Sequence, residues 1–305
     1  MFCIVSLIIF SVLGLFSATH RQFAKEAFDC VFRRVTFRPC NTGFREKVKG
    51  IILVKLMRRS EFSARVFNKH FEFLAWVFFV LMLVSSFYVA RGGYNYYLYG
   101  NCNGANEDGF CLFDPTGENN KVSPVEDSCN AVEPSIDSLN VDNLDLGRLY
   151  HINNNSENNV VFIGCYVCDF TRKAYPDLMK LLEKKKPNFY FGHLPVNHQS
   201  DYLSQYDYCA QTSLSGDYLK YMDLMFLSKP ENLSDNLYLH STIKKAGYEI
   251  DEIEKCLIDI NLEKNIQKNI DNIGGTNIYG TPLVFINGEP LTGPKPYRVY
   301  RGYLK

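Results

Sequence analysis

Two stretches of the chain carry apolar side chains all the way round, with no polar face. Residues 1–18 and residues 73–90 contain no Asp, Glu, Lys or Arg, and each is 18 residues long. About 20 apolar residues can cross the hydrocarbon core of a bilayer, whereas a helix on the surface of a soluble protein keeps a polar face. The pattern therefore predicts two membrane-spanning helices. A signal peptide is the alternative for residues 1–18, but such a peptide opens with positive charge and this stretch does not.

The segment between the two stretches, residues 19–72, is basic. It carries 13 Lys and Arg against 5 Asp and Glu. The positive-inside rule assigns a short basic loop to the cytoplasm, which leaves both ends of the chain outside. Over residues 44–71, apolar and basic residues are spaced as in a helix that lies on an anionic membrane surface. A solvated basic loop is the alternative.

The composition changes after the second stretch. Residues 91–155 are rich in Asn, Gly, Asp, Pro and Ser and have few apolar runs, which predicts a juxtamembrane loop and linker. The folded domain is expected over residues 156–305. Residues 91–305 carry 20 Lys and Arg against 28 Asp and Glu, and the whole chain is neutral. This charge does not favour nucleic acid as a partner.

The order of elements in the domain predicts an α/β fold. A short β-rich run is followed by a helical stretch, a proline and a second β-rich run, which together predict a right-handed βαβ unit. A helix-rich region and a hairpin signal at Asn287-Gly288 complete the pattern. The ranges are 160–163 for the first strand, 169–186 for the helix, 189–196 for the second strand, 202–273 for the helical region and 283–288 for the hairpin.

A CxxC pair, Cys165 and Cys168, lies between the first strand and its helix. Four interpretations compete: a zinc ligand pair, a structural disulfide, a redox pair and chance. A zinc site needs a second Cys or His pair, and the chain has neither a second CxxC nor an HxxxH. At an exposed helix N-terminus the first thiolate is stabilised and the second thiol can resolve a mixed disulfide, so the position favours redox chemistry. The histidines of this region lack the spacing of a triad or metal site and are interpreted as surface or loop residues: His151, His193, His198 and His240.

Residues 163–168, the helix-rich region and the run YGTPLVFING at residues 279–288 together resemble the DsbA-like branch of the thioredoxin superfamily. The likeness covers about residues 155–305. It implies a thioredoxin fold with a helical insertion and a cis peptide bond before Pro282 that faces the cysteines. Thr281 would then offer a free backbone N–H and C=O to an extended substrate chain. The predicted fold class is therefore α/β, a thioredoxin fold with a helical insertion, preceded by two transmembrane helices.

The resemblance also bears on other cysteines. It implies a second pair, Cys209 with Cys256, as a stabilising bridge. Cys102 and Cys111 could close a small juxtamembrane loop, which leaves Cys129 odd, but counting alone does not establish these pairs. The cysteines of the basic loop are expected to remain thiols in a reducing cytoplasm, and one more lies in the first stretch: Cys30, Cys40 and Cys3.

One residue departs from the family pattern. The strong oxidants of the family carry a histidine just before the second cysteine, where this chain has Val167. Without that cation the helix terminus is the main expected stabiliser of the thiolate. The disulfide should therefore be less oxidising.

These features predict a membrane-anchored, extracytoplasmic thiol–disulfide oxidoreductase. It would exchange disulfides with protein substrates, and with a membrane redox partner as a further candidate, and would need no metal and no cofactor beyond its own disulfide. The direction of electron flow and the substrates stay open. A copper-delivery module using the same pair is the alternative, with Met179 as the nearest added soft ligand. A redox sensor is a third interpretation, but the basic loop hardly provides an output domain.

Overall fold

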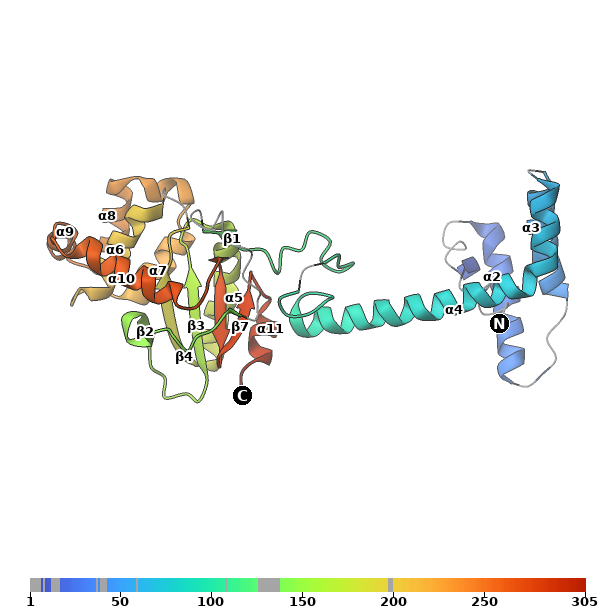
Figure 1. Ribbon diagram of the computed structural model, residues 1–305, viewed down its shortest axis with the longest axis horizontal. Coiled ribbons are helices and arrows are strands. Elements are labelled where there is room, and N and C mark those ends of the chain that lie inside the picture. The colour runs from blue at the N-terminus through green and yellow to red at the C-terminus, as the bar shows by residue number, and fades with distance from the viewer. Residues whose placement is uncertain are drawn as a thin grey trace. The chain divides into compact units, whose positions relative to one another are not determined.

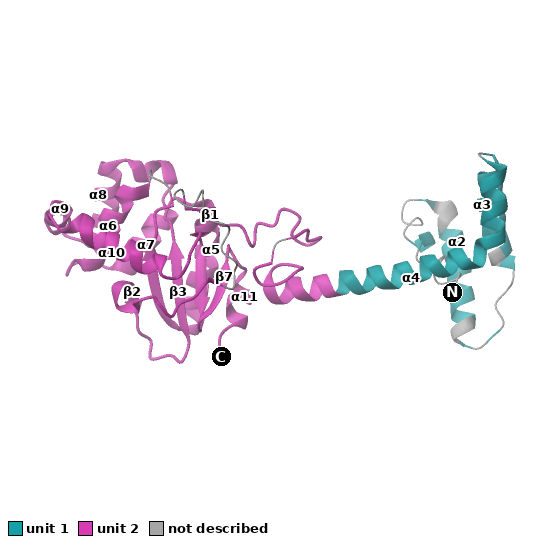
Figure 2. Cartoon of the chain, in the orientation of Figure 1, with its two compact units in different colours: residues 1–90 teal, residues 91–305 magenta. Residues whose placement is uncertain are grey.

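The computed structural model describes residues 7, 9–11, 17–36, 38, 43–58, 60–107, 109–125, 138–196 and 200–305. The chain divides into two compact units, residues 1–90 and 91–305, which Figure 2 distinguishes by colour. Most of the span predicted over residues 1–18 falls outside the described residues.

The first unit contains α2 (Ala18–Val35), α3 (Gly43–Met57) and most of α4 (Glu61–Tyr99). Ala27, Cys30 and Val48 form a small buried cluster between α2 and α3. Much of the predicted amphipathic segment 44–71 is helical, although a non-helical residue, His70, kinks α4. Cys30 is in a disulfide, which corrects the expectation of a free thiol there.

Helix α4 contains the second predicted span. Among the described residues it is the one helix long and apolar enough to cross a membrane. Phe73, Trp76, Leu81 and Phe87 are each more than half exposed. An apolar helix surface that its own chain does not cover is typical of a membrane-facing helix. Two spanning helices are not confirmed, because most of the first span lies outside the described residues.

A five-stranded sheet organises the second unit, in the order β2-β4-β3-β6-β7 (Figure 1). Strands β3 and β4 are parallel and joined by α5, which confirms the predicted βαβ unit, and the other pairs are antiparallel. A last helix, α11 (Tyr297–Gly302), follows the hairpin. The bounds are β2 Tyr150–Ile152, β3 Asn159–Gly164, α5 Asp169–Lys185, β4 Asn188–His193, β6 Leu283–Ile286 and β7 Glu289–Thr292.

Successive strand residues face opposite sides of the sheet, as the pleat requires, and both sides are covered. One side packs against α5, the helical insertion and α11 through Val160, Phe162, Phe189, Phe191, Val284, Ile286 and Leu291. The other packs against the last insertion helix and the loop ahead of β2 through Val161, Ile163, Leu283 and Phe285. Because both faces are buried, the strands are continuous apolar runs rather than alternating ones.

The predicted helical insertion lies between β4 and the short strand β5 (Gly280–Thr281). Asp217 and Asp235 are the N-cap residues of α7 and α8, and their side chains each accept a hydrogen bond from a backbone N–H of the first turn. A disulfide between Cys209 and Cys256 joins α6 to α9, the pairing that the family resemblance implied. The bounds are α6 Asp201–Thr212, α7 Tyr218–Leu227, α8 Asn236–Lys245, α9 Ile250–Leu257 and α10 Leu262–Gly274, with 3₁₀ turns η3 Leu146–Arg148 and η5 Pro230–Ser234.

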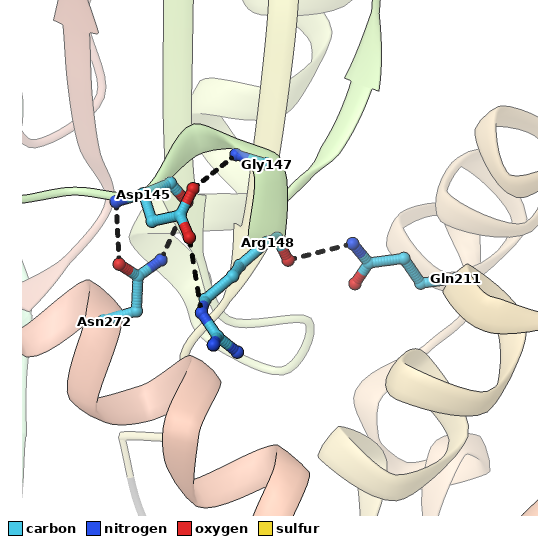
Figure 3. Close-up of polar contacts among 5 residues, drawn as sticks. All are labelled: Asp145, Gly147, Arg148, Gln211 and Asn272. Atoms are coloured by element: carbon cyan, nitrogen blue, oxygen red, sulfur yellow. Dashed lines mark hydrogen bonds and ion pairs between the residues drawn. The ribbon is translucent and has the colours of Figure 1, made fainter.

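Polar contacts fasten the segment ahead of β2 to the insertion (Figure 3). The Asp145 carboxylate accepts a hydrogen bond from the Gly147 N–H at 3.0 Å, which caps η3. The backbone of Asp145 pairs with the side-chain amide of Asn272 in α10 at 2.8 and 3.0 Å. The Arg148 carbonyl accepts from the Gln211 amide of α6 at 3.1 Å. The edge of the sheet and the insertion are therefore tied together.

Residues 91–155 differ from the predicted loop and linker. Their described parts belong to the second unit. Strand β2 is an edge strand of the sheet, and a further short strand, β1 (Ser123–Pro124), pairs antiparallel with β5. The folded domain therefore begins well before residue 156.

Asparagine side chains explain why this apolar-poor segment still folds onto the domain. Asn106 donates from its side-chain amide to the Pro290 carbonyl at 2.8 Å and accepts from the Thr292 N–H at 3.0 Å. These two contacts give hydrogen-bond partners to backbone groups on the outer edge of β7. A disulfide between Cys102 and Cys111 closes the loop that carries Asn106. Side-chain hydrogen bonds hold the loop that carries Asn106, so the hydropathy pattern does not reveal this loop. Leu139, Leu144 and Leu149, later in the same segment, are buried in the core.

Candidate active site: the cysteine pair and the cis-proline turn

The cysteine pair lies in a turn between β3 and α5. A Cβ on Gly164, the last residue of β3, would lie 2.6 Å from the methyl carbon of Thr171, so only glycine allows the strand to approach the helix this closely. The Cys165 N–H donates to the Thr171 hydroxyl at 3.4 Å, and the Cys168 N–H donates to the Cys165 carbonyl at 3.3 Å. Both cysteines are free thiols.

The two thiols are buried, which corrects the expectation of an exposed attacking thiol. Cys165 is 0% exposed and Cys168 is 6% exposed. Val196 completes their cluster, and Val125 and Val167 pack against it. Cys168 is the N-cap residue of α5, and Cys165 precedes the helix altogether. Neither thiol therefore has the position that the sequence pattern suggested, with the first at the helix start and the second one turn along.

The two thiols differ in pKa because their surroundings differ. The pKa of Cys165 is lowered to about 7, first by a hydrogen bond from the Cys168 thiol and then by the backbone N–H groups of Val167 and Val196 and the side chain of Ser200, which together outweigh the effect of burial. The pKa of Cys168 is raised, by its hydrogen bond to Cys165, by burial and by the charge on Cys165. Cys165 is therefore the thiol of the pair that ionises near neutral pH, and Cys168 keeps its proton. Direct hydrogen bonds replace the helix terminus as the main stabiliser.

The cis-proline turn brings the other predicted site residues to the cysteines. The Thr281–Pro282 peptide bond is cis, as the resemblance implied. Thr281 is fully buried, and its side chain favours the thiolate form of Cys168, although its hydroxyl makes no hydrogen bond of normal geometry. Cys165, Cys168, Thr281 and Pro282 are thus assembled at one place from segments more than a hundred residues apart.

The Thr281 backbone, however, already has a partner. In the β1–β5 pair, Ser123 lies opposite Thr281 and Pro124 lies opposite Gly280. The Val125 N–H extends the pairing by donating to the Tyr279 carbonyl at 3.1 Å. The expectation that this backbone is left free for a substrate is therefore wrong for this structure, because the segment before residue 126 folds back over the turn.

Sequence reasoning did not single out Tyr166, which anchors the turn between the cysteines. Its hydroxyl donates to the Asp207 carboxylate of α6 at 2.5 Å, and the Tyr218 hydroxyl donates to the same carboxylate at 2.6 Å. The Tyr166 ring stacks on His193 with centroids 4.7 Å apart and packs on Phe226 at 4.9 Å. His193 is thus buried at the end of β4 rather than on the surface. Only the position of Tyr166 inside the CxxC motif could have drawn attention to it.

Arg172 is a second residue that the sequence did not reveal. Its guanidinium donates to the Tyr166 carbonyl at 2.7 Å and to the carbonyls of Met225 and Ser228 at the end of α7. Burial lowers the pKa of Arg172, and the negative charges of Asp169, Glu231 and Cys165 act in the opposite direction. Arg172 is therefore a positioning residue, which holds the turn against the insertion. Its signal in the sequence is a lone arginine one helical turn after Cys168.

The described residues contain no group of three or more His, Cys, Asp or Glu side chains arranged to hold a metal ion. Met179 packs against the main core. The copper interpretation therefore finds no third ligand in the part of the chain that is described.

Comparison with solved structures returned bacterial thioredoxin-like proteins. A thioredoxin-like oxidoreductase from Silicibacter pomeroyi DSS-3 is 14% identical, with a TM-score of 0.45 over 55% of this chain and 94% of that one. Wolbachia pipientis alpha-DsbA1 is 18% identical, with a TM-score of 0.44 over 52% and 89%. The catalytic domain of Proteus mirabilis ScsC is 20% identical, with a TM-score of 0.43 over 55% and 93%. No protein-family model matches the chain, and no curated protein matches its sequence.

The strand order, the βαβ unit, the insertion and the cis-proline hairpin define a thioredoxin fold. The helical insertion between β4 and β5 gives it the DsbA-like arrangement. In this respect the domain resembles the DsbA-like thiol–disulfide oxidoreductases.

Burial of His193 predicts a loss of stability in acid. Burial lowers its pKa from 6.5 to about 3, so below pH 6.5 the unfolded chain takes up a proton that the folded chain does not. The stabilisation is complete above pH 6.5 and is lost as the pH falls toward 3. At about 1.4 kcal/mol per pH unit, it amounts to about 2 kcal/mol between pH 7 and pH 5. His193→Phe, which keeps a ring on Tyr166, should remove this dependence.

Asp207 acts in the opposite sense. Burial raises its pKa from 3.8 to about 6, so its contribution is complete below pH 3.8 and is lost as the pH rises through about 6. This contribution is present in both proteins. The quantity to measure is therefore the difference in unfolding free energy between wild type and His193→Phe, from urea unfolding of the detergent-solubilised chain at pH 7 and pH 5. A difference that does not change with pH would contradict the prediction.

Proposed function

We propose that this protein is a membrane-anchored thiol–disulfide oxidoreductase that exchanges disulfides with protein substrates. The observation that carries the proposal is the asymmetry of the buried pair beside the cis-proline turn. The pKa of Cys165 is lowered to about 7 and that of Cys168 is raised. One thiol is thus ready to attack at neutral pH, and the other is held in its protonated form until it is needed.

The exchange proceeds through two displacements. In the reducing direction the Cys165 thiolate attacks one sulfur of a substrate disulfide, the substrate S–S bond breaks, and the leaving sulfur takes a proton from solvent. A mixed disulfide then joins Cys165 to the substrate. Cys168 loses its proton and attacks the Cys165 sulfur, which releases the second substrate thiol and leaves a Cys165–Cys168 disulfide. Two electrons have passed to the substrate, and the reverse sequence oxidises a dithiol.

The loss of the negative charge from Cys165 explains why the two cysteines cannot exchange their attacking and resolving roles. Once Cys165 is in a mixed disulfide, its negative charge is gone, and with it the main interactions that raise the pKa of Cys168. The side chain of Thr281 favours the Cys168 thiolate at that stage. Val167 adds no charge to the pair, so the direction of net electron flow is set by the potential of the partner.

The membrane anchor is supported by α4, whose apolar side chains are exposed over residues 73–90. The basic residues of the preceding loop favour the cytoplasm for that loop, and this supports the opposite side of the membrane for the thioredoxin-fold domain. The disulfide at Cys30 favours the oxidising side for the same loop. The proposed orientation follows the charge distribution, because 13 Lys and Arg residues support it, whereas a single disulfide opposes it.

Cysteine variants test the roles within the pair. Cys168→Ser should accumulate mixed disulfides with substrate proteins, because the resolving thiol is gone. Cys165→Ser should accumulate none and lose exchange activity. Non-reducing electrophoresis of the chain after acid quenching and alkylation separates the two outcomes. Trapping by Cys165→Ser in place of Cys168→Ser would reverse the assignment.

Introduced cysteines test the orientation. Leu214 in the domain and Met57 in the basic loop are both strongly exposed, at 101% and 60%, so a cysteine at either position can react. In intact cells a membrane-impermeant maleimide should label Leu214→Cys and should label Met57→Cys only after permeabilisation. The matched background is the otherwise unchanged chain. The opposite labelling pattern would place the domain in the cytoplasm and exclude a role outside it.

A further inference from the structure

A segment of the chain itself crosses the cysteine site. We name residues 122–125 the strap. Its central residues form β1, which pairs antiparallel with β5, and its last residue, Val125, donates to the Tyr279 carbonyl. The contact is close, because a Cβ on Gly280 would lie 2.7 Å from both the Ser123 carbonyl oxygen and a Val122 methyl carbon.

The strap also covers the sulfur atoms. Val125 packs against the cluster of Cys165, Cys168 and Val196, and the Ser123 side chain faces the Cys168 thiol closely enough to favour its thiolate. The attacking thiol has no exposed surface in this arrangement. Cys165 is therefore closed to a substrate sulfur in this structure, and Val125 of the strap is part of its cover.

The strap is firmly held at one end. Asn120, two residues before it, binds the side chain of Lys295, which is 1% exposed, and donates to the Glu107 carbonyl at 2.8 Å. The Asn120 backbone lies against Gly293, where a Cβ would approach it to 2.6 Å. At the site itself, within the described residues, the strap contributes the two-residue strand β1 and the apolar packing of Val125. Local opening of such a short pairing costs far less than unfolding of the domain.

We infer that the strap is an internal occupant of the substrate-docking edge, which keeps the cysteine pair latent until an incoming chain displaces it. The inference rests on the proposed function and concerns the regulation of the same site. An extended substrate can make the same backbone hydrogen bonds to Tyr279 and Thr281 that the strap makes, so displacement exchanges equivalent bonds. Ser123 lies beside the thiols with an oxygen where a substrate would present sulfur, so the strap cannot itself be attacked.

The occupant also indicates the class of substrate. The strap is an extended segment with a small residue, Ser123, beside the thiols and a β-branched residue, Val125, over the sulfur cluster. Substrates that compete with it must therefore present their cysteine in a locally extended or unfolded segment. A disulfide held inside a rigid native fold cannot take that shape.

Alkylation of Cys165 tests whether the strap covers the site. The full chain in detergent is treated with limiting dithiothreitol, and the rate of iodoacetamide modification of Cys165 is followed by mass spectrometry. Rates are compared on the plateau above the thiol pKa, where differences in pKa no longer contribute. Val125→Ala removes apolar contact over the sulfur atoms. Gly280→Ala adds a Cβ on β5 that collides with Ser123 and Val122 and so pushes the strap off β5. Each should raise the plateau rate about tenfold, since about 1.4 kcal/mol of lost contact is a factor of ten.

Gly274→Ala is the matched control, because a Cβ there meets nothing within 4 Å, and its rate should equal that of wild type. Wild-type rates in both strap variants would overturn the inference. Reduction of insulin disulfides, measured on the same proteins, separates this failure from failure of the proposed function. Insulin reduction by wild type with no change in alkylation refutes the strap alone. Faster alkylation in the strap variants, with no insulin reduction by any of the proteins, refutes the proposed function. The strap would then cover the cysteine pair without regulating an exchange activity.

Discussion

A thiol removed from water can ionise only where hydrogen-bond donors replace the water, and the whole site depends on this constraint. Cys165 has no exposed surface, yet its pKa is lowered to about 7. Its donors come from the partner thiol, from two backbone N–H groups and from Ser200. If the turn between the cysteines moved, the donors would be lost and burial alone would raise the pKa. Holding that turn in place is therefore the main structural requirement of the domain.

The helical insertion holds this turn in place through contacts with α6 and α7. Tyr166 reaches from the CxxC motif to Asp207 in α6, and Arg172 ties the turn to the end of α7. The Cys209–Cys256 bridge connects α6 to α9, so α6 is itself fixed within the insertion. The insertion is thus part of the redox site, and Ser200, the N-cap residue of α6, donates a hydrogen bond to the attacking sulfur. The strap closes the site from the other side, through β5 and the cis-proline turn.

Local patterns predicted the parts of this structure that depend on neighbouring residues. The apolar runs of β3, β4 and β6, the helix after the CxxC motif and the hairpin at Asn287-Gly288 all follow from spacing along the chain. The burial of Cys165 and the contact of His193 with Tyr166 depend on residues far away in sequence. The same is true of Asn106, which binds residues more than 180 positions later. Hydropathy finds buried apolar faces, and it does not detect segments held by side-chain amides.

The central claim is that Cys165 is a buried thiolate at neutral pH, and ultraviolet absorbance of the thiolate measures this directly. The reduced full chain is titrated from pH 4 to pH 10 beside Cys165→Ser, and the difference between the two curves belongs to Cys165. The account predicts a midpoint near 7 in the difference curve, and a further loss of ionisation at that pH in Cys168→Ser, which removes the principal donor. A midpoint near 9, the ordinary value for a thiol, would contradict the account.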